Sequence, residues 1–217
     1  MPTPHPRFAV ILPVKPPHRG KSRLVGIDDD RRAALARAFA LDTAEACLAT
    51  PSVAAVLAVT DDVRFSFELG ALGCDAIPDG VSGDLNESLR QAAAEVVRRW
   101  PGLVPVALCG DLPALRPADL DAALSSIVSS IQGSGPSYVV DAAGTGTTLY
   151  TAAYERFTPS FGVDSAHLHR EGGAMPVPGD LPSLRQDVDT VADLRVASGL
   201  GLGHRTMLAA LEAGLLG

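Results

Sequence analysis

Lysine is scarce in this chain. Of the 18 Lys and Arg residues, only Lys15 and Lys21 are lysines, and both lie in one short N-terminal segment. Asp and Glu together number 25, so the formal net charge is −7. No basic stripe offers the phosphate-neutralising surface of a nucleic-acid-binding protein. The charge balance therefore argues against polymeric nucleic acid as a partner.

Cysteines are few, and long apolar runs are absent. Cys47, Cys74 and Cys109 are odd in number, lack a C-x-x-C spacing and lie in apolar segments, so neither a disulfide framework nor a zinc site is indicated. No run reaches the roughly 18 apolar residues of a membrane span. Residues 1–7 lack the charged-then-apolar order of a signal peptide. We therefore expect a cytoplasmic protein with no membrane partner and with its cysteines in the core.

The remaining composition is typical of a globular protein. Hydrophobic residues make up 47% of the 217 residues and charged residues 20%, while 21 Gly and 17 Pro stay below the fraction typical of disorder. At roughly 150 residues per domain, this length predicts one large domain rather than two. Residues 1–217 are therefore expected to share one core.

Short apolar runs alternate with helical patterns over the first 140 residues. Continuous apolar runs predict buried strands, and apolar residues at helical spacing predict helices. The predicted strands are 8–14, 53–60, 76–77, 104–109 and 137–140, and the predicted helices are 29–48, 63–72, 85–100 and 117–127. Farther on, strands are expected near 148–151 and 174–177, and helices near 165–170, 191–197 and 204–213. This alternation favours an α/β fold with a mostly parallel central sheet and helices on both faces.

Carboxylates follow segments that should end at one edge of this sheet. Asp111 comes directly after the run at 104–109, and Asp187 and Asp189 flank Val188, so both point to one side of an extended segment. Ligands of open parallel sheets bind outside the carboxyl ends of the strands. Mg²⁺ is usually held by a few carboxylates together with substrate phosphates. We predict a magnesium site at Asp111, Asp187 and Asp189; the alternative is that Asp111 and Asp189 only cap helices or turns.

The two lysines and Arg23 follow the first predicted strand. Lys15 comes directly after it, and Lys21 and Arg23 lie on the same loop. Three cations over the carboxyl edge could bind a polyphosphate, although a basic loop is often only solvated surface. Residues 20–22 read Gly-Lys-Ser like the end of a P-loop, but Lys15 stands where that motif requires glycine. We predict Lys15, Lys21 and Arg23 as catalytic cations rather than as part of a P-loop.

The sequence does not carry the motif spacings that three other kinds of site require. Gly144 and Gly146 begin a dinucleotide-binding fingerprint whose third glycine position is Leu149, and no G-x-S-x-G motif is present. His167 and His169 are two residues apart and cannot share one face of a helix. A dehydrogenase, a serine hydrolase and a two-histidine metal site are therefore not supported.

Six short motifs between Phe8 and Leu194 resemble one enzyme family in their order. They are L-P-V-K at 12–15, K-S-R-L at 21–24, G-D-L-P at 110–113, G-T-G-T at 144–147, F-G-x-D-S at 161–165 and D-V-D-T at 187–190. This set resembles the phosphoenolpyruvate/2-phospho-L-lactate guanylyltransferases of coenzyme F420 biosynthesis, which have a Rossmann-like, GT-A-type nucleotidyltransferase fold. G-D-L-P alone also resembles molybdenum-cofactor nucleotidyltransferases. Such an enzyme, or a non-catalytic nucleotide-binding module, is the alternative.

The resemblance implies transfer of GMP from GTP to phosphoenolpyruvate or 2-phospho-L-lactate, with release of diphosphate. Mg²⁺ and the basic loop would neutralise the two anionic substrates and align attack on the α-phosphorus, without a covalent nucleophile. GTP would bind the 1–140 part of one domain and the acceptor the 141–217 part. The product could pass to the next enzyme of the F420 pathway.

The resemblance also assigns site residues. It places the phosphoacid at Thr147, Gly162 and Ser165, where the 144–147 turn and the helix start at 165 are expected to offer free backbone N–H groups. It places GTP at Lys15, Asp79, Gly80, Asn86 and Ser88, although Asn86 could instead cap the helix at 85–100.

Overall fold

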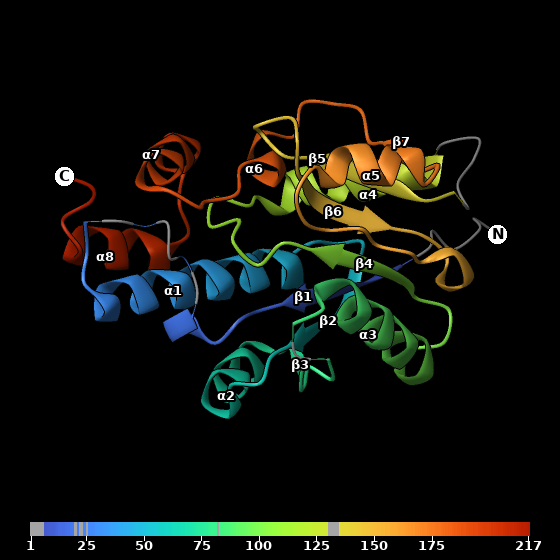
Figure 1. The fold of residues 1–217 in the computed structure, drawn as a ribbon, viewed down its shortest axis with the longest axis horizontal. Helices are drawn as coiled ribbons and strands as arrows, with labels where there is room; N and C mark the ends of the chain where they lie inside the picture. The colour runs from blue at the N-terminus through green and yellow to red at the C-terminus, as the bar shows by residue number, and fades with distance from the viewer. Residues whose placement is uncertain (1–6, 20, 22–23, 25, 82, 130–134) are drawn as a thin grey trace.

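One seven-stranded sheet runs through the molecule (Figure 1). The computed structural model describes residues 7–19, 21, 24, 26–81, 83–129 and 135–217. The strands are β1 (Phe8–Pro13), β2 (Val53–Val59), β3 (Asp75–Ile77), β4 (Val104–Leu108), β5 (Ser137–Val140), β6 (Thr147–Thr151) and β7 (Met175–Pro176). Their order is β3-β2-β1-β4-β6-β5-β7. Strand β6 is antiparallel to β4 and β5, whereas the other pairings are parallel.

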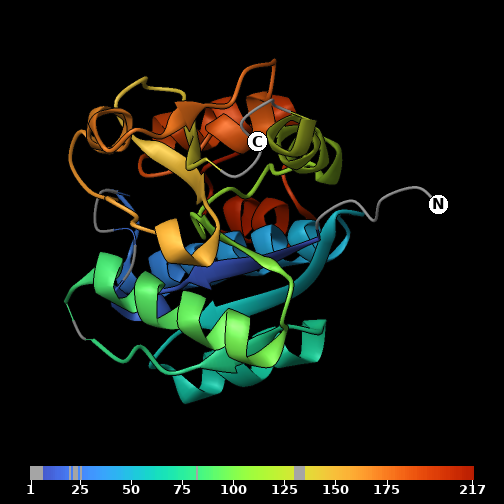
Figure 2. The same ribbon diagram turned by 90° about the vertical axis from the view of Figure 1, so that its right-hand side faces the viewer.

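Helices cover both faces of this sheet, as Figure 2 shows from the side. The α-helices are α1 (Asp29–Leu48), α2 (Val63–Leu72), α3 (Leu85–Arg99), α4 (Pro117–Ser129), α5 (Ser165–Glu171), α6 (Pro182–Arg185), α7 (Val191–Leu200) and α8 (His204–Glu212). Two 3₁₀ turns, η1 (Pro17–Arg19) and η2 (Tyr154–Arg156), complete the elements. Within the described ranges, no helix is both long and apolar enough to cross a membrane.

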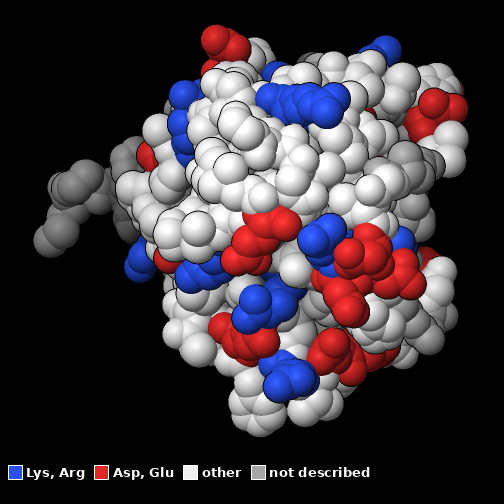
Figure 3. Space-filling view, turned by 90° about the vertical axis from the view of Figure 1, so that its left-hand side faces the viewer, with Lys and Arg blue, Asp and Glu red and all other residues white. Residues whose placement is uncertain are grey.

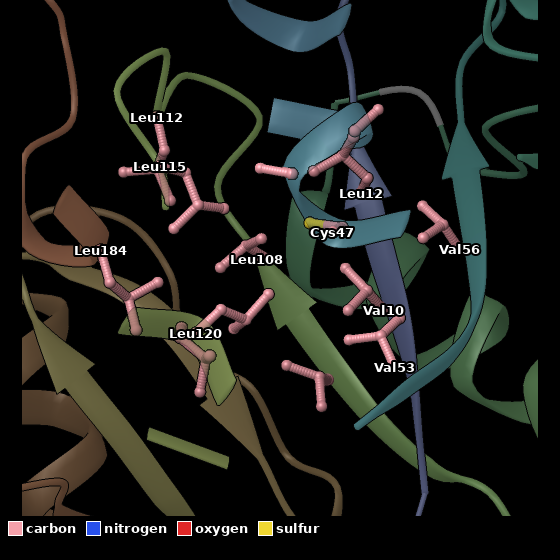
Figure 4. Close-up of a cluster of buried hydrophobic side chains, with 14 of the residues drawn as sticks. Val10, Leu12, Cys47, Val53, Val56, Leu108, Leu112, Leu115, Leu120 and Leu184 are labelled. Atoms are coloured by element: carbon pink, nitrogen blue, oxygen red, sulfur yellow. The ribbon is translucent and has the colours of Figure 1, made fainter. Parts of the chain in front are cut away.

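The core is divided by the alternation of strand side chains. In β1, Val10 and Leu12 face a cluster completed by α1, α2, α4 and α6, which Figure 4 shows around Leu108 and Cys47. Ile11 faces the opposite cluster, which α3 and α5 complete. A third cluster packs α7 and α8 against the N-terminal half of α1. Because both faces of β1 are buried, its sequence is continuously apolar.

The α/β class and the mostly parallel sheet predicted from the sequence are confirmed. The helices at 29–48 and 63–72 have the predicted bounds. Strand β6, in contrast, inserts antiparallel between β4 and β5. A buried five-residue segment contains no local signal for strand direction, because pairing is decided by tertiary packing. The short helix α6 and both 3₁₀ turns were also not predicted.

This topology brings the carboxyl ends of β1 and β4 side by side. The chain builds outward from β1 to β2 and β3 and then returns to β4 on the other side of β1, which makes this a topological switch point. Gly110 follows β4 there. A Cβ atom at Gly110 would lie 3.2 Å from the Pro13 carbonyl oxygen, so glycine lets the turn pass close to the end of β1.

The C-terminal helix α8 is capped by a carboxylate of α1. Asp42, whose side chain is 2% exposed, accepts hydrogen bonds from the Thr206 amide at 2.7 Å and the Arg205 amide at 3.3 Å. It also accepts one from the Arg205 guanidinium at 3.2 Å. A Cβ at Gly203 would come within 2.5 Å of this carboxylate, so glycine is required for the close approach. Asp42 thus satisfies N–H groups that α8 cannot satisfy internally.

We predict that Asp42→Ala lowers the free energy of unfolding by about 2–3 kcal/mol, because a cap and buried charge-assisted hydrogen bonds are lost. The matched control is Glu45→Ala, which also loses a contact with Arg205 but is 58% exposed and caps no backbone. Its cost should stay below about 1 kcal/mol. Urea denaturation measures both, and equal losses would contradict the capping role.

Candidate active site

The turn after β4 is fastened to the C-terminal segment. The Val188 amide donates to the Asp111 carbonyl at 3.0 Å, and the Gly203 amide donates to the Pro113 carbonyl at 2.8 Å. Val188 is fully buried, whereas Asp187 and Asp189 on either side of it are partly exposed. The predicted alternation at 187–189 therefore agrees with the burial, and it brings the two carboxylates to the turn that carries Asp111.

Lys21 is the counterion of this cluster. Its ammonium contacts the Asp111 carboxylate and lies 2.8 Å from Asp189 Oδ1, and its side chain is 11% exposed. Burial lowers the pKa of Lys21, but the two carboxylates outweigh it, so this pKa lies above its ordinary value. Lys21 has a φ of +56°, in the left-handed region that lysine rarely adopts. Such backbone strain is typical of functional sites.

The cluster still carries an excess of negative charge. Burial, followed by the charges of Asp111, Asp141 and Asp189, raises the pKa of Asp187 to about 7. Asp111 Oδ1 is buried and has no hydrogen-bond partner among the residues that the structure describes. The three predicted ligands therefore lie in one negatively charged cluster, and their binding of Mg²⁺ stays a prediction. Across the described residues, however, no three His, Cys, Asp or Glu side chains form a ready-made metal-binding group.

The other two predicted cations are placed differently from Lys21. Lys15 is exposed, and no carboxylate of the described chain pairs with it. Arg23 lies outside the described residues.

Strands β1 and β4 point towards the left of Figure 1. On that face, drawn in Figure 3, acidic and basic side chains are interspersed.

The segment predicted to hold guanine is tied together by its own polar residues. Ser88 is buried, and its hydroxyl donates to the Asp79 carboxylate and to the Asp84 carbonyl at 3.0 Å. The Asp79 amide donates to Asp61 at 2.9 Å. Gly80 lies on this loop beside Gln91. Asp79 and Ser88 thus fix the loop's shape, and their contact with GTP remains a prediction.

Asn86 joins this segment to the predicted acceptor loop. Its side-chain amide donates to the Phe161 carbonyl at 2.9 Å and accepts from the Phe161 amide at 2.7 Å. Helix α3 is instead capped by Asp84, so the alternative that Asn86 is the cap is wrong. Likewise, Thr190 rather than Asp189 caps α7.

The expectation that the glycine-rich turn offers free amides is wrong for three of its residues, and the Gly144 amide donates to the Asp141 carbonyl at 3.2 Å. The Thr145 and Gly146 amides donate to the Asp141 carboxylate at 3.0 and 2.9 Å. A Cβ at Gly146 would lie 2.3 Å from Asp141 Oδ2, so glycine makes this approach possible. Sequence reasoning missed Asp141, although its position before a Gly-rich turn is typical of such a carboxylate–amide contact.

The three predicted acceptor residues lie around α5 and β6. Thr147 begins β6 and is buried; Ser165 begins α5 and is also buried. Gly162, with a φ of +139°, is exposed on the connecting loop, and Asp164 before α5 has a φ of +54° and makes no side-chain cap. The Ala166 amide donates to the Thr145 carbonyl at 3.0 Å, which brings the 144–147 turn against the start of α5. The expectation of free N–H groups at this helix start is therefore wrong for Ala166, and also for His167, whose amide donates to the Asp164 carbonyl at 3.0 Å.

His169 links these elements, and sequence reasoning considered it only as a metal ligand. Its Nδ1 lies 2.9 Å from Thr147 Oγ1, and its Nε2 accepts from the Ser160 amide at 2.9 Å. The ring stacks on Tyr150 with centroids 4.6 Å apart. Burial, opposed by a hydrogen bond to the Ser165 backbone, lowers the pKa of His169 to about 4. The imidazole is therefore neutral near pH 7.

Comparison with known proteins decides the family. No family model matches the chain. A phosphoenolpyruvate guanylyltransferase of Streptomyces coelicolor is 46% identical over 213 residues, which cover 97% of this chain and 98% of the relative. One of Salinispora arenicola is 45% identical over 206 residues, covering 93% and 92%. The chain belongs to the phosphoenolpyruvate guanylyltransferase family.

Solved structures share the fold of this guanylyltransferase family member at low identity. A Desulfovibrio desulfuricans protein assigned as a nucleotide-diphospho-sugar transferase has a TM-score of 0.69 at 18% identity, covering 97% of this chain and 96% of its own. A cytidylyltransferase of Leptospira borgpetersenii has a TM-score of 0.56 at 14% identity, covering 97% of each chain. The predicted nucleotidyltransferase fold is thereby confirmed.

The buried histidine of this family member predicts a pH-dependent stability. Because the pKa of about 4 lies below the ordinary 6.5, the unfolded chain takes up the proton first. The contribution is fully present above about pH 6.5 and is lost as the pH falls towards 4. Between pH 7 and 4.5 the free energy of unfolding should fall by about 2 kcal/mol more in the wild type than in His169→Gln. If the wild type and His169→Gln lose equal free energy of unfolding, groups other than His169 cause the acid sensitivity.

Proposed function

We propose that this chain transfers GMP from GTP to phosphoenolpyruvate and releases diphosphate, as a single-domain cytoplasmic enzyme of coenzyme F420 biosynthesis. The chain is 46% and 45% identical to two phosphoenolpyruvate guanylyltransferases over nearly its full length, and this similarity supports the reaction. The structural observation that carries it is the Asp111, Asp189 and Lys21 cluster at the switch point of a nucleotidyltransferase fold. 2-Phospho-L-lactate is the alternative acceptor, because it has the same phosphate and carboxylate groups.

Asp111, Asp187 and Asp189 are the residues that would hold Mg²⁺. Two observations support this: Asp111 Oδ1 is buried without a hydrogen-bond partner in the described part of the chain, and neighbouring negative charges help to raise the pKa of Asp187. One or two carboxylates plus substrate phosphates suffice for Mg²⁺, so a ready-made three-ligand group is not required. When bound, the ion would stabilise negative charge on the triphosphate during displacement.

The basic residues neutralise the remaining charge. Lys21 balances the carboxylates and lies where a triphosphate would meet them. Lys15, exposed at the end of β1, can reach a phosphate without breaking an ion pair to a described residue. Arg23 is proposed to join them. An acceptor phosphate oxygen then attacks the α-phosphorus of GTP and diphosphate leaves, and no covalent enzyme intermediate is needed.

The substrates are proposed to bind on either side of this cluster. Guanine would meet the loop that Asp79 and Ser88 hold closed, together with Gly80 and Asn86. Phosphoenolpyruvate would meet Thr147, Gly162 and Ser165. Asn86, which contacts Phe161 between the two sides, would couple their geometry. The product could then be delivered to the next enzyme of the pathway.

Diphosphate release from GTP and phosphoenolpyruvate tests this function. Turnover should require a divalent metal and vanish with a chelator, and ATP or CTP should not replace GTP. Asp111→Asn keeps the side-chain shape but removes a charge, so kcat should fall by about 10²-fold or more.

The matched control is Asp121→Asn. Asp121 accepts hydrogen bonds from Ser52 at the start of β2, at the opposite edge of the sheet. Its kcat should remain near the wild-type value. Turnover that persists undiminished with a chelator, or in Asp111→Asn, would refute the proposed metal site.

Two further variants test the acceptor site. Thr147→Val and Ser165→Ala should each weaken phosphoenolpyruvate binding by roughly 1 to 3 kcal/mol, the value of a hydrogen bond to a charged group, without changing GTP binding. Thr151→Val is the control, because Thr151 is buried at the other end of β6 and donates to the Pro105 carbonyl at 2.8 Å. Calorimetric titration of both substrates measures the effect. If GTP binding falls and phosphoenolpyruvate binding does not, Thr147 and Ser165 belong to the GTP site instead.

A further inference from the structure

His169 is a buried side chain to which the proposed reaction assigns no role. It is 2% exposed on α5, and its ring stacks on Tyr150 at an interplanar angle of 20°. Phe161 packs edge-on against the same ring, with centroids 5.4 Å apart. The orientation of the imidazole is therefore fixed by aromatic contacts on more than one side.

The hydrogen bonds of this ring decide its tautomer. The Ser160 amide can only donate, and it lies 2.9 Å from Nε2, so Nε2 must carry a lone pair. A neutral imidazole carries one proton, and burial keeps His169 neutral near pH 7 by lowering its pKa to about 4. The proton therefore resides on Nδ1.

This tautomer restricts the neighbouring hydroxyl. Nδ1 lies 2.9 Å from Thr147 Oγ1, and a protonated Nδ1 can donate but cannot accept. The Thr147 hydroxyl must therefore direct its own proton away from His169. Thr147 begins β6, and its carbonyl accepts a hydrogen bond from Cys109 Sγ at 3.4 Å. Cys109 lies two residues before Asp111. The hydroxyl thus belongs to the edge of the sheet that carries the carboxylate cluster.

We propose that His169 is a positioning residue that makes the Thr147 hydroxyl a hydrogen-bond donor to the anionic phosphoacid. This inference rests on the proposed function, which takes Thr147 as an acceptor-binding residue. An anion can only accept hydrogen bonds, so a hydroxyl that has lost the option of donating to its neighbour is suited to bind it. The Ser160 amide, on the segment that leads to Gly162, sets the tautomer that produces this effect.

The tautomer is measured directly on the wild-type protein. Long-range ¹H–¹⁵N correlation of the His169 ring near pH 7 should show a protonated Nδ1 and an unprotonated Nε2, with and without phosphoenolpyruvate. His167, which is exposed on the same helix, provides the reference for a ring in water. A protonated Nε2 would overturn the proposal without any variant.

Two substitutions separate the two ends of the ring. His169→Gln keeps an acceptor near the Nε2 position for Ser160 but loses the Nδ1 donor, so KM for phosphoenolpyruvate should rise about tenfold while KM for GTP is unchanged. His169→Asn keeps a donor near the Nδ1 position and should restore most of that loss. A purely structural role predicts the reverse or an equal effect on both substrates.

A double variant tests whether His169 acts through Thr147. If His169 acts through Thr147, adding His169→Gln to Thr147→Val should raise KM for phosphoenolpyruvate no further, whereas independent effects multiply. Multiplying effects, or a KM for GTP that rises in parallel, would overturn the proposal. Absence of wild-type turnover with GTP and phosphoenolpyruvate would instead overturn the proposed function and, with it, the ligand named here.

Discussion

The sheet brings Asp111, Asp187 and Asp189 to one edge and so places like charges close together in a partly buried setting, where Asp111 and Asp189 disfavour ionisation of Asp187. Backbone contacts hold these segments together against the repulsion. The hydrogen bond from Val188 to the Asp111 carbonyl and the burial of Val188 are such contacts. Lys21 then supplies the positive charge that the free protein needs.

The two proposed substrate sides are built on different physical principles. The side around Asp79 and Ser88 is a loop held by polar contacts: the Ser88 hydroxyl donates to Asp79, and the Asp79 amide donates to the Asp61 carboxylate of the preceding loop. The opposite side adds aromatic packing to a local contact: Asp141 holds the Gly-rich turn that follows it, and His169 packs among aromatic rings. Asn86 spans both, since its amide satisfies the two backbone polar groups of Phe161. A displacement of α3 would therefore be transmitted to the acceptor loop.

The sequence predicted those features whose cause is local. Apolar runs and capping aspartates located the parallel strands and the long helices, because burial on both faces and helix termini leave direct traces in the sequence. The alternation at 187–189 likewise indicated how its carboxylates would face. Strand β6 was predicted without its direction, because antiparallel insertion depends on pairing partners distant in sequence. His169 was missed because its partners Thr147 and Tyr150 become its neighbours only after folding. Asp141 was missed although its partners, Thr145 and Gly146, follow it within five residues.

The turn carrying Asp111 and Pro113 holds the C-terminal segment at both ends, through Val188 on one side and Gly203 on the other. The residues between these contacts, including α7, therefore form a closed excursion whose ends are fixed to one short piece of backbone. The entropic cost of such an excursion grows only slowly with its length. Length changes on its exposed side can accordingly be accommodated while Asp187 keeps its place, provided that Leu194 and Ala197 of α7 stay buried in the third cluster. The outer surface around α7 can therefore diverge in shape without altering the chemistry beneath it.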